Sequence, residues 1–253
     1  STAYGCPTPL PATFPLGFDG FYCMKYEATT GVFLEFINSL SYDQQASHLT
    51  ENGSANLPNV VGSWFDRPNE YTHWTRVSTV GTFNTVSAVF INNYPWATQG
   101  YMSWRQTAAF LDWSGLRPMT EFEYEKASRG TLNPVAYEYP WGTTVMNTSS
   151  GGMNNANTVN ETMNQVNEGI VHYNWDGGPM RSGFAATSNS NRLQAAATFY
   201  GIMEMAGNVM EQCVGGGTGY NYSTFTTVNG DGALTKKGLA DVSGWPIDGG
   251  TTS

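Results

Sequence analysis

Two glutamates in the C-terminal half of the chain form the set of side chains most able to do chemistry. Glu204 and Glu211 flank a turn at Ala206-Gly207-Asn208, within residues 200–212, which read YGIMEMAGNVMEQ. Two carboxylates with main-chain carbonyls between them offer the hard oxygen ligands that Ca²⁺ takes, about six to eight at a time. The same carboxylates can also stabilise the turn without a metal. A calcium site and a metal-free turn are therefore both open at this point.

Cysteines and histidines give weaker signals. Cys6 and Cys23 can close a short disulfide loop in an oxidising compartment and leave Cys213 free, while three reduced thiols are equally allowed. No GxSxG, P-loop or dinucleotide fingerprint is present. The three histidines show no metal-ligand spacing, and each is interpreted as a solvated or hydrogen-bonded side chain: His48, His73 and His172.

The composition is that of a globular chain with many loops. Of the 253 residues, 40% are hydrophobic, which is enough for a core, and only 12% are charged, against about 25% in ordinary soluble domains. Asn, Ser, Thr and Gly supply the polar character instead, and these residues favour turns over long helices. No linker is clear enough to divide the chain, so we expect one domain over residues 1–253.

Charge excludes several classes of partner. The formal net charge is −9, and the 11 Lys and Arg residues are scattered. Binding to nucleic acid or to an anionic membrane surface requires clustered positive charge, so neither is expected. No apolar run reaches the roughly 18 residues that a membrane-spanning helix needs.

The N-terminal part predicts a strand followed by a helix. Residues 21–27 are rich in aromatic side chains and follow Asp19-Gly20, which favours a strand. Thr29 or Thr30 can cap the helix that comes next. Apolar residues at the spacing of one helical face indicate its buried side: Phe33, Phe36, Ile37 and Leu40.

A second helix is expected to begin after Ser103 and to end at Ser114-Gly115. Its apolar stripe consists of Trp104, Ala108 and Leu111. Large aromatic side chains around this block are expected to be buried: Trp104, Trp113, Phe122, Tyr124 and Trp141.

A third helix is expected to begin after Thr120, because Glu123 stands three residues on and completes a capping box. Glu125 and Arg129 are four residues apart and can form an ion pair. Gly130 is a natural stop.

Two long regions have no clear periodicity. Residues 41–100 are turn-rich, with short β-like pieces such as 84–91. Residues 143–192 are dominated by Asn, Gly, Ser and Thr, which indicates either functional loops or irregular structure held by other contacts.

Three blocks together resemble the formylglycine-generating enzyme, or sulfatase-modifying factor, family. They are residues 21–40, residues 102–130 with YPWG at 139–142, and residues 200–212. Their sequence looks most like secreted paralogues of Bacteroidetes-type bacteria. The resemblance implies an α+β, irregular, loop-rich C-type-lectin-like fold, with a few short helices and small antiparallel sheets.

The resemblance also implies a calcium site in the third block. Its ligands would be the side chains of Glu204 and Glu211 and the carbonyls of Gly207 and Val209. The first of these is often Asp or Asn in the family, so Glu204 is a longer-armed departure. A second family calcium site lies after YPWG, where Asn157 is the best match.

Catalysis is where the resemblance weakens. The family's formylglycine chemistry uses two copper-binding cysteines near an RGGSW…GFR pattern, which these residues do not contain. Cys213 matches neither position, so copper is not expected and the family's C-terminal segment is expected to be missing.

Two functions remain open. The first is a non-catalytic extracellular or cell-surface module that binds a protein or glycan, or assembles with copies of itself or a complementing segment of another chain. The second is a copper-dependent formylglycine-generating oxidase whose catalytic segment is not in this chain.

Overall fold

The structure is a computed structural model that describes residues 10–49, 60–61, 74–76, 86–100, 102–148, 152–165, 167–172, 179–216, 224–248 and 251–252. Cys6 and His73 lie outside these residues. The described helices are short: α1 (Thr30–Ser39), α2 (Tyr42–Leu49), α4 (Trp104–Trp113) and α5 (Glu121–Arg129).

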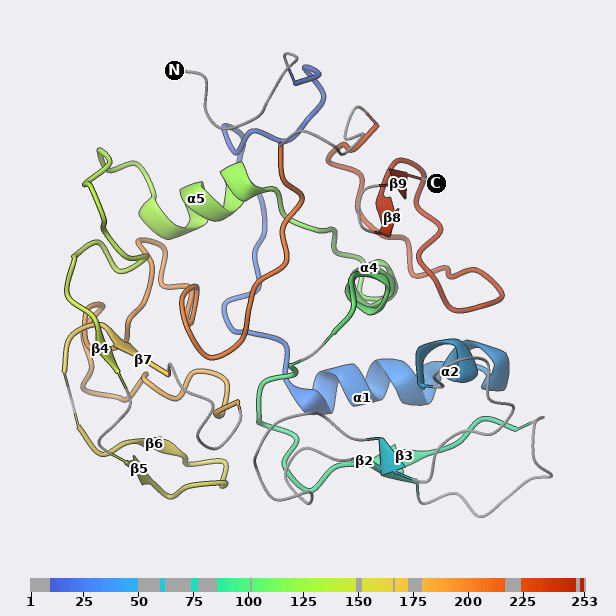
Figure 1. Ribbon diagram of the computed structural model, residues 1–253, viewed down its shortest axis with the longest axis horizontal. Coiled ribbons are helices and arrows are strands. Elements are labelled where there is room, and N and C mark those ends of the chain that lie inside the picture. The colour runs from blue at the N-terminus through green and yellow to red at the C-terminus, as the bar shows by residue number, and fades with distance from the viewer. Residues whose placement is uncertain are drawn as a thin grey trace.

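Small sheets complete a mixed α+β architecture (Figure 1). An antiparallel three-stranded sheet runs in the order β1 (Val60–Val61), β2 (Trp74–Arg76), β3 (Phe90–Ile91). Three strand pairs follow: β4 (Asn147–Thr148) with β7 (Ile170–Val171) in parallel, β5 (Met153–Asn154) with β6 (Thr162–Met163), and β8 (Pro246–Asp248) with β9 (Thr251–Thr252). The expected α+β class, with few short helices and small sheets, is confirmed, but the sheets are not all antiparallel as expected, because β4 and β7 pair in parallel.

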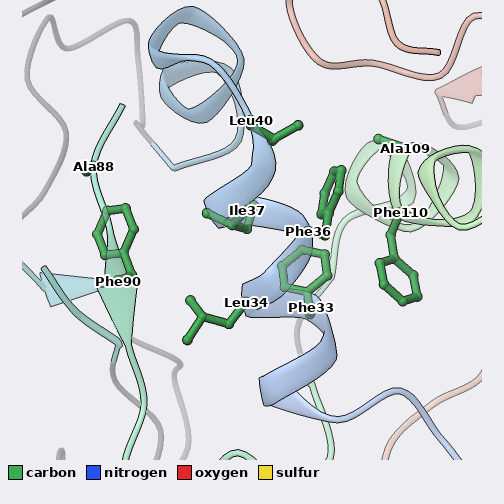
Figure 2. Close-up of a cluster of buried hydrophobic side chains, with 9 residues drawn as sticks. All are labelled: Phe33, Leu34, Phe36, Ile37, Leu40, Ala88, Phe90, Ala109 and Phe110. Carbon is green, nitrogen blue, oxygen red and sulfur yellow. The ribbon is translucent and has the colours of Figure 1, made fainter. Parts of the chain in front are cut away.

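Helix α1 carries the largest apolar cluster. Thr29 caps it by accepting a hydrogen bond from the main-chain nitrogen of Val32, as expected. In Figure 2 the helix lies between α4 and the β3 segment. The predicted stripe is buried between them, with Leu40 just beyond the last helical residue: Phe33, Phe36, Ile37 and Leu40.

Helix α2 is absent from the sequence-based prediction, which had residues 41–100 as turn-rich. Its one buried residue is polar, because Gln45 is fully removed from solvent. The Gln45 amide donates to the carbonyls of Ile37 (2.9 Å) and Ala88 (2.8 Å) and accepts from the Ala88 nitrogen (2.7 Å). Tyr42, Ala46 and Leu49 also pack against the core from this helix at i, i+4 and i+7, a short apolar pattern that the sequence-based prediction overlooked.

Helices α4 and α5 confirm their predicted caps. Ser103 begins α4 through a capping box with Gln106, and Thr120 begins α5 through one with Glu123. Gly130 ends α5 with a φ of 72°. The predicted pair of Glu125 and Arg129 also forms.

Two expectations are wrong. Residues 21–27 are not a strand, because within the described chain they pair with no strand and are joined to residues 201–214 by a single main-chain bond, from the Met203 nitrogen to the Lys25 carbonyl (2.9 Å). Phe122 is 37% exposed, because only part of its ring is covered by the edge-on contact with buried Phe14 (6.3 Å between ring centroids), whereas Trp141 is 1% exposed.

Residues 143–192 are irregular structure held by other contacts, as far as they are described. A small apolar cluster anchors them through Met163, Ile170, Met180, Phe184 and Ala185. The Trp141 indole adds a hydrogen bond to the carbonyl of Val145 (2.9 Å). Among the described residues, no helix has both the length and the apolar character to cross a membrane.

Candidate metal centre

Two distant segments bring three glutamates together. Residues 21–27 lie beside residues 201–214, joined by the bond between Met203 and Lys25. Glu27 ends the first segment, and Glu204 and Glu211 lie in the second. Burial is the largest cause of a raised pKa at each of these carboxyls, and like charge within the group adds to it at Glu27 and Glu211. Glu27, Glu204 and Glu211 are called the acidic cluster below.

Glu204 is buried and held by main-chain donors. Its carboxylate accepts hydrogen bonds from the nitrogens of Gly183 (2.9 Å) and Phe184 (3.1 Å). The φ of Glu204 is +58°, a left-handed value that L residues with side chains rarely adopt. Strained positions of this kind persist only where the surroundings fix them.

Glu27 accepts hydrogen bonds with both of its oxygens. Oε2 accepts from the Asn208 side-chain amide (2.6 Å) and the Thr98 hydroxyl (3.1 Å), and Oε1 accepts from the Val209 nitrogen (3.3 Å). The negative charge of Glu204 adds to burial in raising the pKa of Glu27, so the two carboxyl groups influence one another.

The backbone of the turn between Glu204 and Glu211 fixes the direction in which the Gly207 carbonyl points. Gly207 and Asn208 have φ values of +93° and +59°. The Asn208 nitrogen donates to the carbonyl of His172 (2.9 Å). In a trans peptide the carbonyl points opposite to the N–H of the same unit, so the Gly207 carbonyl points away from His172.

One carboxylate oxygen of Glu211 accepts no hydrogen bond from the described residues. This oxygen, Oε1, is buried. Burial, with the charge of Glu204, raises the pKa of Glu211 to about 7. An unsatisfied buried carboxylate oxygen is costly, by about 1–3 kcal/mol or more.

Positive charge close to the acidic cluster comes from Arg181, which lowers the pKa of Glu204 against the larger effect of burial. Its guanidinium donates to three main-chain carbonyls, those of Glu161 (2.8 Å), Ser182 (3.0 Å) and Gly183 (2.9 Å). Arg181 therefore braces the turn that holds Glu204 and offsets part of the negative charge there.

These residues fit a divalent cation of the calcium type. The set offers carboxylate oxygens and a directed carbonyl, and Oε1 of Glu211 accepts no hydrogen bond from the described residues, which leaves it available to a cation. When bound, Ca²⁺ would supply charge neutralisation to carboxyl groups that otherwise repel one another. The residues that would hold it are Glu204, Gly207, Val209 and Glu211.

A second acidic group has a structural explanation. Among the described residues, Asp112, Asp231 and Asp241 place one oxygen each within 4.8 Å of the others. Asp112 is fully buried, and its two oxygens accept from the nitrogens of Asp231 and Asp241, both at 3.1 Å. It anchors two loops to the end of α4.

A model of the sulfatase-modifying factor enzyme 1-like domain matches residues 12–237. The chain belongs to this family. Two curated relatives are similar over part of their length. A formylglycine-generating enzyme of Thermomonospora curvata is 33% identical over 113 residues, which is 45% of this chain and 31% of that protein. A formylglycine-generating enzyme of Mus musculus is 27% identical over 136 residues, 49% of this chain and 34% of that protein.

The matches span about a third of each of these relatives. No solved structure matches the chain significantly. Membership of the family confirms the resemblance carried by the three sequence blocks. Because only about a third of each relative is matched, family membership alone does not assign their enzymatic activity to this chain.

The second predicted calcium residue of this sulfatase-modifying-factor-like domain, Asn157, lies in a turn away from the acidic cluster. Its φ is +61°, and its nitrogen donates to Oε2 of buried Glu161 (2.6 Å). Oε1 of Glu161 accepts from the Arg181 nitrogen (3.0 Å). Arg181 therefore connects the turn of Asn157, through Glu161, to the segment that binds Glu204, through the Gly183 carbonyl. That Asn157 is a calcium ligand remains a prediction.

The described cysteines are thiols in a negative environment. Burial raises the pKa of Cys23, and burial with the charges of Glu211 and Glu121 raises the pKa of Cys213 to about 12. Both cysteines are free. His48 donates to the carbonyl of Gly238 (2.7 Å), which agrees with a hydrogen-bonded histidine.

Sequence reasoning missed Glu27, Thr98 and Arg181. Glu27 was assigned only to a predicted strand. The one local signal was a glutamate at the end of an aromatic segment inside the first family block. Nothing in the sequence placed Thr98 or Arg181 near Glu204.

Proposed function

We propose that this chain is a calcium-stabilised, non-catalytic module of the extracellular space or cell surface. Its C-type-lectin-like scaffold would bind a protein or glycan, or assemble with other copies of itself. The single observation that carries the non-catalytic part is the state of Cys23 and Cys213. Both have raised pKa values, and carboxylates rather than cations surround Cys213.

Copper chemistry and nucleophilic chemistry both need thiolates. A Cu(I) site is built from paired soft ligands, and reactive cysteines lie in electropositive surroundings. Glu211 and Glu121 act in the opposite sense at Cys213. In the part of the chain that is described, the cysteines are therefore suited to packing.

Exposed apolar side chains support a binding role. Tyr22 is 99% exposed and Phe18 86% exposed, on a segment that Lys126 holds by hydrogen bonds to the carbonyls of Phe18 and Asp19, both at 3.0 Å. Tyr137 is 93% exposed with a φ of +63°, and Met210 is 93% exposed beside Glu211. Aromatic residues and Met on fixed segments are enriched at interfaces.

Light scattering over a range of concentrations, with calcium and with EDTA, tests self-assembly. We expect masses above that of the monomer at high concentration, and a smaller association in the double variant Tyr22→Ser/Met210→Ser. The matched control is Val145→Ser, which changes an apolar side chain that is 45% exposed elsewhere. A monomer at all concentrations, with no retention on immobilised glycans or cell-surface protein, contradicts the proposal.

The second candidate is a copper-dependent formylglycine-generating oxidase. It is supported by the names of the two curated relatives. The test is oxygen consumption with a cysteine-containing peptide in the presence of copper. Copper-dependent turnover establishes the oxidase and removes the non-catalytic proposal, whereas calcium binding without turnover favours the module.

A further inference from the structure

We propose that Glu27 is a positioning residue for the calcium site, because it fixes the turn that carries the carbonyl ligands through Asn208 and Val209. Thr98 assists Glu27, because its hydroxyl donates to Glu27 and accepts from Asn208. The inference rests on the proposed calcium site and names a residue outside its ligand set. The two residues at its centre, Glu27 and Asn208, are 181 positions apart in the chain.

The turn needs an external hold because its backbone is strained. Gly207 and Asn208 follow one another with positive φ values, and a left-handed residue with a side chain costs roughly 1–2 kcal/mol. Three hydrogen bonds hold Asn208 besides its bond to Glu27. Its nitrogen donates to His172 (2.9 Å), its amide donates to Thr98 (2.9 Å), and its Oδ1 accepts from the Met180 nitrogen (2.8 Å).

Glu27 is the member of this network that spans the turn. Oε2 receives the Asn208 amide, and Oε1 receives the nitrogen of Val209, the next residue. One carboxylate therefore fixes a side chain and the following peptide unit together. The peptide unit that Glu27 fixes contains the Asn208 carbonyl and lies between the Gly207 and Val209 carbonyls. The Gly207 carbonyl is oriented by the bond from the Asn208 nitrogen to His172, and Glu27 holds the side chain of the same Asn208.

The hydrogen bonds distinguish Glu27 from Glu211, although Glu204 also accepts with both of its oxygens, from the nitrogens of Gly183 and Phe184. Both Glu27 oxygens already accept hydrogen bonds from the turn or from Thr98, whereas Oε1 of Glu211 accepts none from the described residues. A carboxylate accepts with both oxygens, but a glutamine amide presents only one acceptor. Glu27→Gln therefore sets an NH₂ group against one of the present donors and loosens the turn.

Thr98 offers a second and milder test. It is almost fully buried, and its hydroxyl donates to Glu27 while accepting from Asn208. Thr98→Val removes both bonds at nearly constant volume. Thr98→Ser keeps the hydroxyl and is the matched control.

The experiment is calorimetric titration of the metal-free chain with CaCl₂, paired with thermal unfolding in EDTA. We expect Glu27→Gln to weaken calcium binding at least tenfold, Thr98→Val to weaken it severalfold, and Thr98→Ser to bind as the parent does. A merely structural role would lower the EDTA melting temperature and leave the calcium dissociation constant unchanged.

Each other outcome has a definite meaning. Parental affinity in Thr98→Val and Glu27→Gln overturns the positioning role and leaves the calcium site standing. Loss of binding in Glu27→Gln with no change in Thr98→Val makes Glu27 a direct ligand, which also overturns it. If the parent chain binds no calcium, both the proposed calcium site and this inference are wrong. If Glu27→Gln does not fold, the Thr98 pair still decides.

Discussion

Gly207 lies against His172 so closely that a β-carbon on the glycine would be 3.0 Å from the His172 carbonyl oxygen. The contact joins the turn of the candidate metal centre to the residue that follows strand β7. It also explains why this turn contains glycine. Both the close approach and a φ of +93° make any larger residue strained at this position.

Gly207→Ala should therefore destabilise the fold and the site together. We expect a loss of about 2 kcal/mol or more in the free energy of unfolding, because backbone strain adds to the contact with His172. Gly201→Ala is the matched control, since Gly201 has a φ of +80° and a β-carbon there would meet no atom of the described chain within 4 Å. It should cost about 1 kcal/mol from strain alone. Equal losses in chemical denaturation would show that the His172 contact is unimportant.

Glu211→Ala should abolish the stabilisation that calcium gives. A ligand that binds only the folded state adds about 2.7 kcal/mol when its concentration is 100 times its dissociation constant. Thermal unfolding with CaCl₂ and with EDTA measures the difference. Glu125→Ala removes an exposed carboxylate from the same chain and should keep the full calcium effect. A melting temperature of the parent that EDTA does not change would contradict the calcium site.

The acidic cluster should make stability fall as pH rises when calcium is absent. Burial raises the pKa of Glu204 and of Glu211, the latter to about 7, so between the unfolded value near 4.5 and about 7 the folded chain binds more protons than the unfolded chain. Stability then decreases with pH across that window. Arg181 opposes the shift at Glu204 but is outweighed by burial.

Calcium should reverse this trend. We expect CaCl₂ to raise the melting temperature strongly at about pH 7.5 and hardly at all at about pH 5, because protons compete for the same oxygens. The measurement is thermal unfolding from about pH 5 to about pH 8, with and without EDTA. Glu211→Gln is the control and should flatten the profile in EDTA. A parent profile that rises through this window in EDTA would mean that other groups dominate.

Local features of the fold were predictable from the sequence. The caps at Thr29, Ser103 and Thr120 were found because a cap depends on residues three or four positions away. The segment 21–27 was predicted wrongly as a strand. Aromatic composition favours a strand, but pairing depends on a partner that the sequence does not identify.

The candidate site was predictable only where its residues are neighbours in the chain. Glu204 and Glu211 share one motif, whereas Glu27 reaches the site from 181 positions away from Asn208. Gln45 shows the same limit in the core. Its buried amide bonds to Ile37 and Ala88, and nothing in the sequence around Gln45 identifies those partners. In both the candidate site and the core, polar contacts between residues far apart in the chain fix the position of the buried side chain.

The capping box of α5 contains a buried ion pair whose removal should be costly. Arg117 contacts Glu123 through both terminal nitrogens, at 2.7 Å and 2.5 Å, and the two side chains are only 11% and 3% exposed. Glu123 also accepts from the Thr120 nitrogen (3.0 Å). Glu123→Gln leaves the Arg117 charge buried without its partner, so we expect a loss of about 3–5 kcal/mol.

Glu125→Gln, two residues along the same helix, is the matched control for that prediction. Its side chain is 58% exposed and pairs with Arg129 at the surface, where such pairs contribute at most about 1 kcal/mol. Urea denaturation of both variants gives the comparison. Similar losses would mean that burial of the Arg117–Glu123 pair adds nothing, and that Glu123 acts only as the helix cap. A loss several times larger in Glu123→Gln would locate the stability of α5 in the pair that lies beneath its first turn.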